Sequence, residues 1–231
     1  MMKRTPGTCS RPRLQVRDLE PSDWAAVEEL FGANGACGGC WCMYWRLERG
    51  GKLWEERKGA PNKGAFKKLI TAGAVHACLA FAGEEPVGWC CAGPRSDFPR
   101  LERSRVLRTD ADEHTWSVVC FFIPARWRGR GVATALLEQA VKLAKKRGAH
   151  ALEGYPVRST KAPGSRIPAA FAWTGVPSLF EKAGFEDVTP AAGTRPIYRR
   201  ELRRRTSSSS GRRRSARRGC WHERNASCPL A

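Results

Sequence analysis

A glycine-rich connection between an apolar run and an amphipathic stretch most constrains the fold of this chain. Residues 116–123 are apolar and rich in β-branched and aromatic side chains, which predicts a central strand. Residues 132–147 carry apolar side chains at helical spacing, which predicts a helix that ends at Gly148. The connection contains Gly129 and Gly131, so the chain passes from strand to helix through a glycine turn.

This turn has the physical features of an anion site. Glycines let the backbone approach a ligand closely, because no Cβ stands in the way. The free amides at a helix start and the helix dipole both favour negative charge. Arg126, Arg128 and Arg130 alternate through the turn. The segment has neither the Gly-Lys-Ser/Thr end of a P-loop nor the three-glycine spacing of a dinucleotide-binding turn. We therefore predict a diphosphate site of another kind, the alternative being a tight turn with solvated arginines.

Two motifs resemble a known enzyme family. Residues 128–133, Arg-Gly-Arg-Gly-Val-Ala, are similar to the Arg/Gln-x-x-Gly-x-Gly/Ala motif of the GNAT superfamily of acyl-CoA N-acyltransferases. Residues 178–185, Ser-Leu-Phe-Glu-Lys-Ala-Gly-Phe, resemble the family's second motif, Leu-Tyr-Glu-Lys-x-Gly-Phe. The resemblance covers residues 13–202. It implies an α/β (α+β) fold: a mixed, mostly antiparallel central sheet with splayed fourth and fifth strands and flanking helices.

The resemblance also implies a reaction and a cofactor site. Members of this family move an acetyl group from acetyl-CoA to a primary amine of a small molecule or peptide, by direct attack and without a covalent enzyme intermediate. Backbone amides of the turn would hold the pyrophosphate, and the preceding strand would hold the pantetheine arm and polarise the acyl carbonyl. The implied cofactor-binding residues are Phe121, Ile123, Arg128, Gly129, Arg130, Gly131, Val132, Ala133 and Thr134.

The proton transfers point to a carboxylate in the next strand. A neutral amine must form before it can attack, so some group must take its proton. Glu153 lies in the predicted strand 151–155, on the same face as Tyr155. A carboxylate in an apolar strand is costly to bury unless it is used or paired. We predict Glu153 as the general base, directly or through water, and Tyr155 as the acid; a salt bridge to an arginine is the alternative for Glu153.

Two positions depart from the family pattern. The family often has a tyrosine acid where this chain has Phe180, which has no proton to give. It also often has an asparagine near the start of the second-motif helix, where Pro177 and Ser178 stand here.

The cysteines allow two interpretations. Cys37, Cys40 and Cys42 form a Cys-x-x-Cys-x-Cys pattern that could ligate zinc. The alternative, which we favour, is that they line a pocket or fill core beside the neighbouring aromatic residues, with no metal. The chain begins without an apolar stretch, so we expect no secretion signal and reduced thiols.

Charge and composition suggest the domain plan. The net charge is +19, and residues 199–231 carry eleven Arg and two Glu. We predict a flexible lead-in over residues 1–12, an N-acetyltransferase domain over 13–202 and a disordered basic tail over 203–231. No run is long enough to span a membrane, so we expect a soluble, cytoplasmic protein. The alternatives are a non-catalytic acyl-CoA sensor, or a nucleic-acid- or ribosome-associated protein targeted by its tail.

The remaining elements follow from periodicity and turn residues. We expect a strand near 14–19, a helix from about 22 to 31, a helix over 54–70 interrupted near Pro61, a hairpin over 75–91, a long loop with some helix over 92–115, a loop over 157–174, a helix over 177–183, and closing strands at 185–188 and 196–202.

Overall fold

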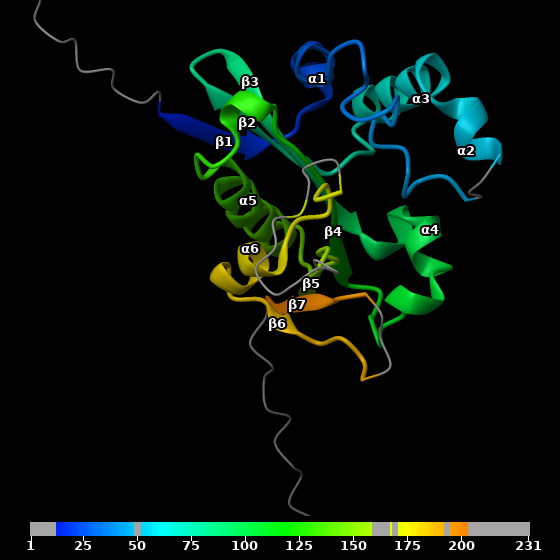
Figure 1. The fold of residues 1–231 in the computed structure, drawn as a ribbon, viewed down its shortest axis with the longest axis vertical. Coiled ribbons are helices and arrows are strands. Elements are labelled where there is room, and N and C mark those ends of the chain that lie inside the picture. Colours follow the sequence, from blue (N-terminus) through cyan, green and yellow to red (C-terminus); the bar gives the residue numbers. More distant parts are fainter. Residues whose placement is uncertain (1–12, 49–51, 159–166, 168–170, 192–194, 203–231) are drawn as a thin grey trace, which may run out of the picture.

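The sheet has seven strands in the order β1-β2-β3-β4-β5-β7-β6 (Figure 1). The structure, a computed structural model, describes residues 13–48, 52–158, 167, 171–191 and 195–202. All neighbouring strands are antiparallel except β4 and β5. The predicted mixed, mostly antiparallel sheet is therefore confirmed. The strands are β1 (Leu14–Asp18), β2 (Ala77–Ala82), β3 (Glu85–Pro94), β4 (Thr115–Phe122), β5 (Ala151–Gly154), β6 (Glu186–Asp187) and β7 (Tyr198–Glu201).

Helices cover both faces of the sheet. One face carries α1 (Trp24–Phe31), α2 (Lys52–Arg57), α3 (Ala60–Thr71) and α4 (Pro99–Glu102), and the other carries α5 (Val132–Lys146) and α6 (Pro177–Lys182) (Figure 1). Short 3-10 turns lie at η1 (Pro21–Asp23), η2 (Arg95–Asp97), η3 (Arg105–Leu107) and η4 (Ala125–Trp127). Each face has its own apolar core. Within the described part of the chain, no helix is long and apolar enough to cross a membrane.

A small residue in β3 lets α5 lie close to the sheet. A Cβ on Gly88 would come 2.6 Å from Cγ1 of Val132 and 2.9 Å from Cδ1 of Leu136. Leu136, Leu137 and Ala140 are completely buried along the same helix. This packing holds the first turn of α5 against the strands, so the glycine turn that precedes it is fixed in place.

Most predicted elements are present. In residues 92–115, β3 is longer than predicted, because it continues to Pro94, which pairs with Trp116 of β4. The short helical turns that follow agree with the helix expected within this loop. The expected helix over 54–70 is two helices, and Pro61 lies in the first turn of the second. The predicted lead-in over 1–12 and basic tail over 203–231 lie outside the described residues.

β4 and β5 separate partway along their length. They pair only from Thr115 to Val118 on β4 and from Ala151 to Gly154 on β5. The register between β3 and β4 shifts at the same level, because Cys91 pairs with Cys120 whereas Ala92 pairs with Val118. A bulge of this kind bends a strand and disrupts its ladder. The last residues of β4 therefore pair with β3 alone, and the sheet opens beside them.

Candidate active site

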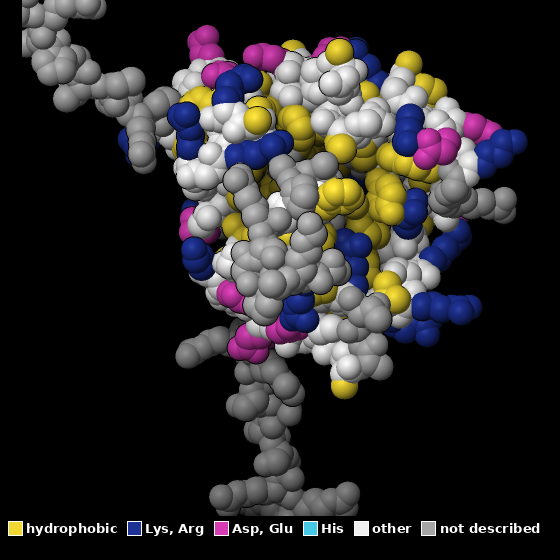
Figure 2. Space-filling model, viewed as in Figure 1, with side chains coloured by type: hydrophobic (Ala, Val, Ile, Leu, Met, Phe, Trp, Pro, Cys, Tyr) yellow, Lys and Arg dark blue, Asp and Glu magenta, His cyan; other side chains and the backbone are white. Residues whose placement is uncertain are grey.

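A cavity of about 790 Å³ opens where β4 leaves β5. Figure 2 shows hydrophobic side chains gathered over β4, in the middle of the face of the molecule that Figure 1 also shows. A second hollow of about 610 Å³ lies between α1 and α3 and includes no residue of the glycine turn. The larger cavity is therefore the candidate site. Its lining residues are Phe31, Ala36, Cys37, Cys40, Cys42, Tyr44, Trp54, Cys120, Phe121, Phe122, Ile123, Arg128, Ala133, Thr134, Ala172, Trp173, Gly175, Val176, Ser178, Leu179 and Lys182.

The glycine turn forms one end of this cavity. Gly129 and Gly131 have positive φ values of 70° and 83°, which side-chain-bearing residues rarely adopt. A Cβ at either position would meet nothing within 4 Å, so the space in front of the backbone is open. The first backbone bond of α5 comes from Ala135 to the Gly131 carbonyl. The preceding amides of the first turn are thus available to an anion.

The three arginines of the turn have different partners. Arg126 forms an ion pair with Glu85, and the Arg130 guanidinium lies over the Trp127 ring, 5.2 Å from its centroid. Arg128 donates to the Ile123 carbonyl at 2.9 Å and also lines the cavity. Lys182 of α6 also lines the cavity. Among the described residues, two cations therefore line the cavity, and Arg128 alone comes from the turn.

The edge of β4 lies between this end and the rest of the cavity. The Phe121 amide donates a hydrogen bond to the Trp173 carbonyl at 2.7 Å, and the Val157 amide donates to the Gly175 carbonyl at 3.0 Å. The segment containing Trp173 and Gly175 thus connects β4 with the chain after β5, across the opening between the strands. A ligand that hydrogen-bonds the Phe121 amide would have to replace the Trp173 carbonyl.

The family assignment comes from the sequence around this site. A sequence profile of the acetyltransferase (GNAT) family matches residues 41–159, just over half of the chain. The chain belongs to this family. The matched region includes β4, the glycine turn and α5, so the GNAT resemblance predicted from residues 128–133 is confirmed.

Solved structures with a similar fold are distant in sequence. An N-acetyltransferase from Staphylococcus aureus is 14% identical in sequence, with a TM-score of 0.49. The match covers 83% of this chain and 99% of the S. aureus chain. The PaiA N-acetyltransferase from Thermoplasma acidophilum, in complex with coenzyme A, is 14% identical over 82% and 99%, with a TM-score of 0.47. A GCN5-related N-acetyltransferase from Kribbella flavida is 18% identical over 82% and 98%, with a TM-score of 0.44. No curated protein is similar enough to count as a match.

In this GNAT domain Glu153 lies in a buried network of charges and hydroxyls. Its side chain has no exposed surface and forms ion pairs with Arg95 at 3.0 Å and Arg199 at 3.2 Å. Tyr155 donates to the same carboxylate at 2.9 Å, and its hydroxyl is 2.8 Å from that of Ser117. Burial, the negative charge of Glu153 and the hydrogen bond to it raise the pKa of Tyr155 well above its usual range.

This network is separate from the cavity wall. Neither Glu153 nor Tyr155 is among the lining residues. The structure thus shows the salt bridges that the sequence left open for Glu153, and it gives an approaching amine no direct contact with the carboxylate. The catalytic roles predicted for these two residues stay predictions.

Phe180, at the position where the family often has tyrosine, is a core residue. Its ring is completely buried and packs edge-on against Phe185, with centroids 5.2 Å apart. It also lies near Phe121 at 6.3 Å and Tyr198 at 6.1 Å. The cavity-lining residues nearest to it in α6 are Ser178 and Leu179. Ser178 is the only one of these that carries a hydroxyl.

The cysteine-rich segment forms another part of the wall. Cys37, Cys40 and Cys42 all line the cavity. The hydrogen bond from Cys42 to the Cys120 thiol raises the pKa of Cys42. The hydrogen bond with Cys91 lowers this pKa and burial raises it, so that the pKa of Cys42 lies well above its usual range. Among the residues that the structure describes, no three His, Cys, Asp or Glu side chains are arranged to hold a metal ion.

Aromatic side chains complete the wall, and the sequence pointed to only some of them. Tyr44 lines the cavity, whereas Trp41 and Trp45 are buried and do not line it. Trp54 and Trp173 also line it, although the sequence marked neither as a site residue. Trp173 follows a stretch without periodicity, so no local signal could place it here.

Proposed function

We propose that this GNAT protein is an acetyl-CoA-dependent N-acetyltransferase that acetylates a primary amine. The observation that carries the proposal is the continuity of one cavity from the glycine turn to the aromatic wall. An acyl donor held at one end and an amine held at the other would meet beside the last residues of β4. One of the solved structures with a similar fold is a complex with coenzyme A, which agrees with this donor.

The residues at the glycine turn fit the donor's diphosphate. The open space in front of Gly129 and Gly131 admits phosphate oxygens to the backbone, and the free amides of α5 can donate to them. Arg128 and Lys182 add two positive charges on the wall. We propose that the implied cofactor set, residues 128–134 with Phe121 and Ile123, binds acetyl-CoA here.

The reaction requires one bond to form, one bond to break and two protons to move. The amine nitrogen forms a bond with the acetyl carbon, the carbon–sulfur bond breaks, and CoA leaves as the thiolate. One proton leaves the nitrogen and one reaches the thiolate sulfur, so the products are the amide and free CoA. No carboxylate or imidazole lines the cavity within the described ranges, so we propose that water carries the amine's proton away.

The lack of a carboxylate or imidazole among the described lining residues favours the alternative function, an acyl-CoA sensor. A wall without an acid–base side chain is what a protein that binds acetyl-CoA without turnover would show. The two functions predict different results with the same reagents. An enzyme releases CoA only when an amine is present, whereas a sensor binds acetyl-CoA and releases none.

The test is a thiol-release assay combined with calorimetry on the full chain. Acetyl-CoA is titrated alone, then incubated with amino acids, polyamines, aminoglycosides and peptides with free N-termini. Amine-dependent release of CoA supports the enzyme. Binding without release across the panel would establish the sensor, and no binding of acetyl-CoA would contradict both.

A further inference from the structure

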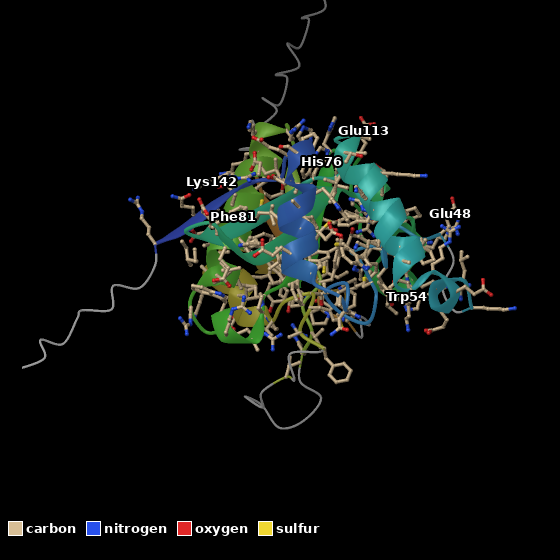
Figure 3. The ribbon with its side chains drawn as sticks, turned by 90° about the horizontal axis from the view of Figure 1, so that it is seen from above. Glu48, Trp54, His76, Phe81, Glu113 and Lys142 are labelled. Atoms are coloured by element: carbon tan, nitrogen blue, oxygen red, sulfur yellow. The ribbon has the colours of Figure 1, made fainter. Side chains whose placement is uncertain are left out.

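The acceptor end of the cavity has a different chemistry from the cofactor end. Away from Arg128 and Lys182, the wall consists of aromatic rings, cysteine thiols and small apolar groups. Figure 3 shows Trp54 on the side of the molecule that carries α2 and α3, across from Lys142 of α5. Trp54 therefore belongs to the helical layer on the face of the sheet opposite α5.

Tyr44 is the centre of an aromatic group. Its ring makes edge contacts with Trp54 at 5.3 Å and 88°, with Trp173 at 5.2 Å and 77°, and with the buried Trp45 at 5.1 Å and 89°. Because these rings hold one another nearly perpendicular, their orientation is fixed before a ligand arrives. Fixed rings favour a flat aromatic ligand, which gains edge-to-face contacts beyond the burial of its area.

The thiols act in the same direction. Cys37, Cys40 and Cys120 line the cavity, and sulfur makes favourable contacts with aromatic ring edges. Two of these thiols resist ionisation. Burial raises the pKa of Cys40, and although the hydrogen bond to Cys42 lowers the pKa of Cys120, burial and neighbouring thiols raise it above its usual range. The wall thus offers soft, neutral surface and no charge partner for a ligand.

The charges around this end would repel a second cation. Arg100 lies over the Tyr44 ring at 3.8 Å, and Arg195 donates to Thr174 at 3.3 Å. Each has a buried nitrogen without a hydrogen-bond partner in the described part of the chain. None of the described residues that line the cavity is acidic. The sequence of the internal segments 49–51, 159–166, 168–170 and 192–194 contains no Asp or Glu. A buried ammonium without a carboxylate is costly.

From these features we infer that the acceptor is an aromatic monoamine: one primary amine on a short aliphatic arm next to an aromatic ring, with no second positive charge. The inference rests on the proposed function and narrows it. The ring lies among Tyr44, Trp54 and Trp173, and the amine points toward β4. Polyamines, aminoglycosides and lysine-rich peptides are excluded as good acceptors.

The first experiment compares acceptors of matched size. 2-Phenylethylamine and its saturated analogue 2-cyclohexylethylamine have the same amine arm, and putrescine adds a second ammonium. The aromatic amine should have a kcat/KM about fivefold above its saturated analogue and at least about a hundredfold above putrescine. Phenylalanine tests whether a carboxylate beside the amine is tolerated: activity with it assigns the acceptor to aromatic amino acids, and activity with 2-phenylethylamine alone assigns it to arylalkylamines.

Two variants test the wall itself. Trp54→Leu should bring the ratio of kcat/KM for 2-phenylethylamine over 2-cyclohexylethylamine close to one. Phe171→Leu is its control, because Phe171 is exposed and does not line the cavity, and it should keep the wild-type ratio. Cys37→Asp should raise kcat/KM for putrescine about tenfold relative to Cys37→Asn, because it places a carboxylate at an exposed position of the wall.

The outcomes separate this inference from the proposed function. If acetyl-CoA binds and putrescine or the saturated amine is acetylated with the same kcat/KM as the aromatic amine, the inferred acceptor class is wrong. The acetyltransferase function stands in that case. An unchanged ratio in Trp54→Leu would also overturn the class. If no amine releases CoA, the proposed function itself fails.

Discussion

The Phe180 ring lies directly over Gly154 of β5. A Cβ on Gly154 would be 2.1 Å from Cε1 of Phe180 and 2.5 Å from its Cζ. The ring is also packed against Phe185 and has no exposed surface. The side chain at the position of the common family tyrosine is thus fixed between α6 and β5, and the site has to work without an acid there.

Gly154→Ala should destabilise the fold. The new methyl group cannot avoid the Phe180 ring, which has no space to move into, and overpacking of this kind costs about 1–3 kcal/mol. Urea unfolding followed by circular dichroism measures the loss. Gly64→Ala is the matched control, because Gly64 is in α3 and a Cβ there meets nothing within 4 Å. That variant should be more stable by about 0.5–1 kcal/mol. Equal stabilities for the two variants would contradict the packing described here.

The parts of the site that could be predicted from sequence are those encoded locally. The glycine turn was predicted from Gly129 and Gly131, which have positive φ angles in the structure. The strand before it and the helix after it were predicted from an apolar run and a helical period. Glu153 in an apolar strand indicated a paired or working carboxylate, and the structure shows the pairing. Each of these signals depends only on residues close together in the chain.

The parts that could not be predicted depend on contacts between distant residues. Arg95 lies in a segment predicted to be a loop, yet its guanidinium is buried and donates hydrogen bonds to Glu153 and the Leu107 carbonyl. Trp173 is positioned beside the cavity by a hydrogen bond from the Phe121 amide, more than fifty residues earlier in the chain, to the Trp173 carbonyl. Neither periodicity nor composition carries information about such pairings.

Glu153→Gln should reduce stability strongly. The substitution leaves Arg95 and Arg199 facing a neutral amide in a buried site, and breaking a buried ion pair costs about 3–5 kcal/mol. Glu102→Gln is the control, because Glu102 pairs with the same Arg95 at 2.9 Å from a half-exposed position. There the expected cost is about 0–1 kcal/mol. Thermal or urea unfolding of both variants at neutral pH tests this.

The same Glu153→Gln variant decides its catalytic role. If Glu153 has only a structural role, as its absence from the cavity wall would allow, the pH dependence of kcat/KM keeps its acidic limb. A general base predicts the reverse: a large fall in kcat/KM and loss of the acidic limb, with acetyl-CoA affinity preserved in calorimetry. Measurement at a temperature where the variant remains folded keeps the two effects apart.

The ion pair between Asp23 and Arg17 should make stability depend on acid pH. Burial raises the pKa of Asp23, but two hydrogen bonds from Arg17 at 2.6 Å, one from the Glu20 amide at 2.7 Å and the charge of Arg17 together lower it below the ordinary 3.8. A lowered folded-state pKa stabilises the fold above the ordinary value, and this contribution is lost as the pH falls through the folded-state pKa. Asp23→Asn should therefore cost about 1–2 kcal/mol at pH 7, and the difference from wild type should shrink below pH 4. A difference in unfolding free energy that stays constant from pH 7 to pH 3 would contradict this linkage.

Gly131→Val should separate the cofactor site from the fold. At φ 83° a β-branched residue is strained, and its side chain would enter the open space where the diphosphate is proposed to bind. Gly73→Val imposes similar strain at φ 68° beyond the end of α3, where the nearest atom to a Cβ is Cγ of Pro21 at 3.7 Å. Both variants should lose about 1–3 kcal/mol of unfolding free energy. Only Gly131→Val should also weaken acetyl-CoA binding, by at least about tenfold, because only its side chain occupies the ligand's place. Calorimetric titration of the two folded variants with acetyl-CoA gives the comparison, and equal affinities would remove the glycine turn from the cofactor site.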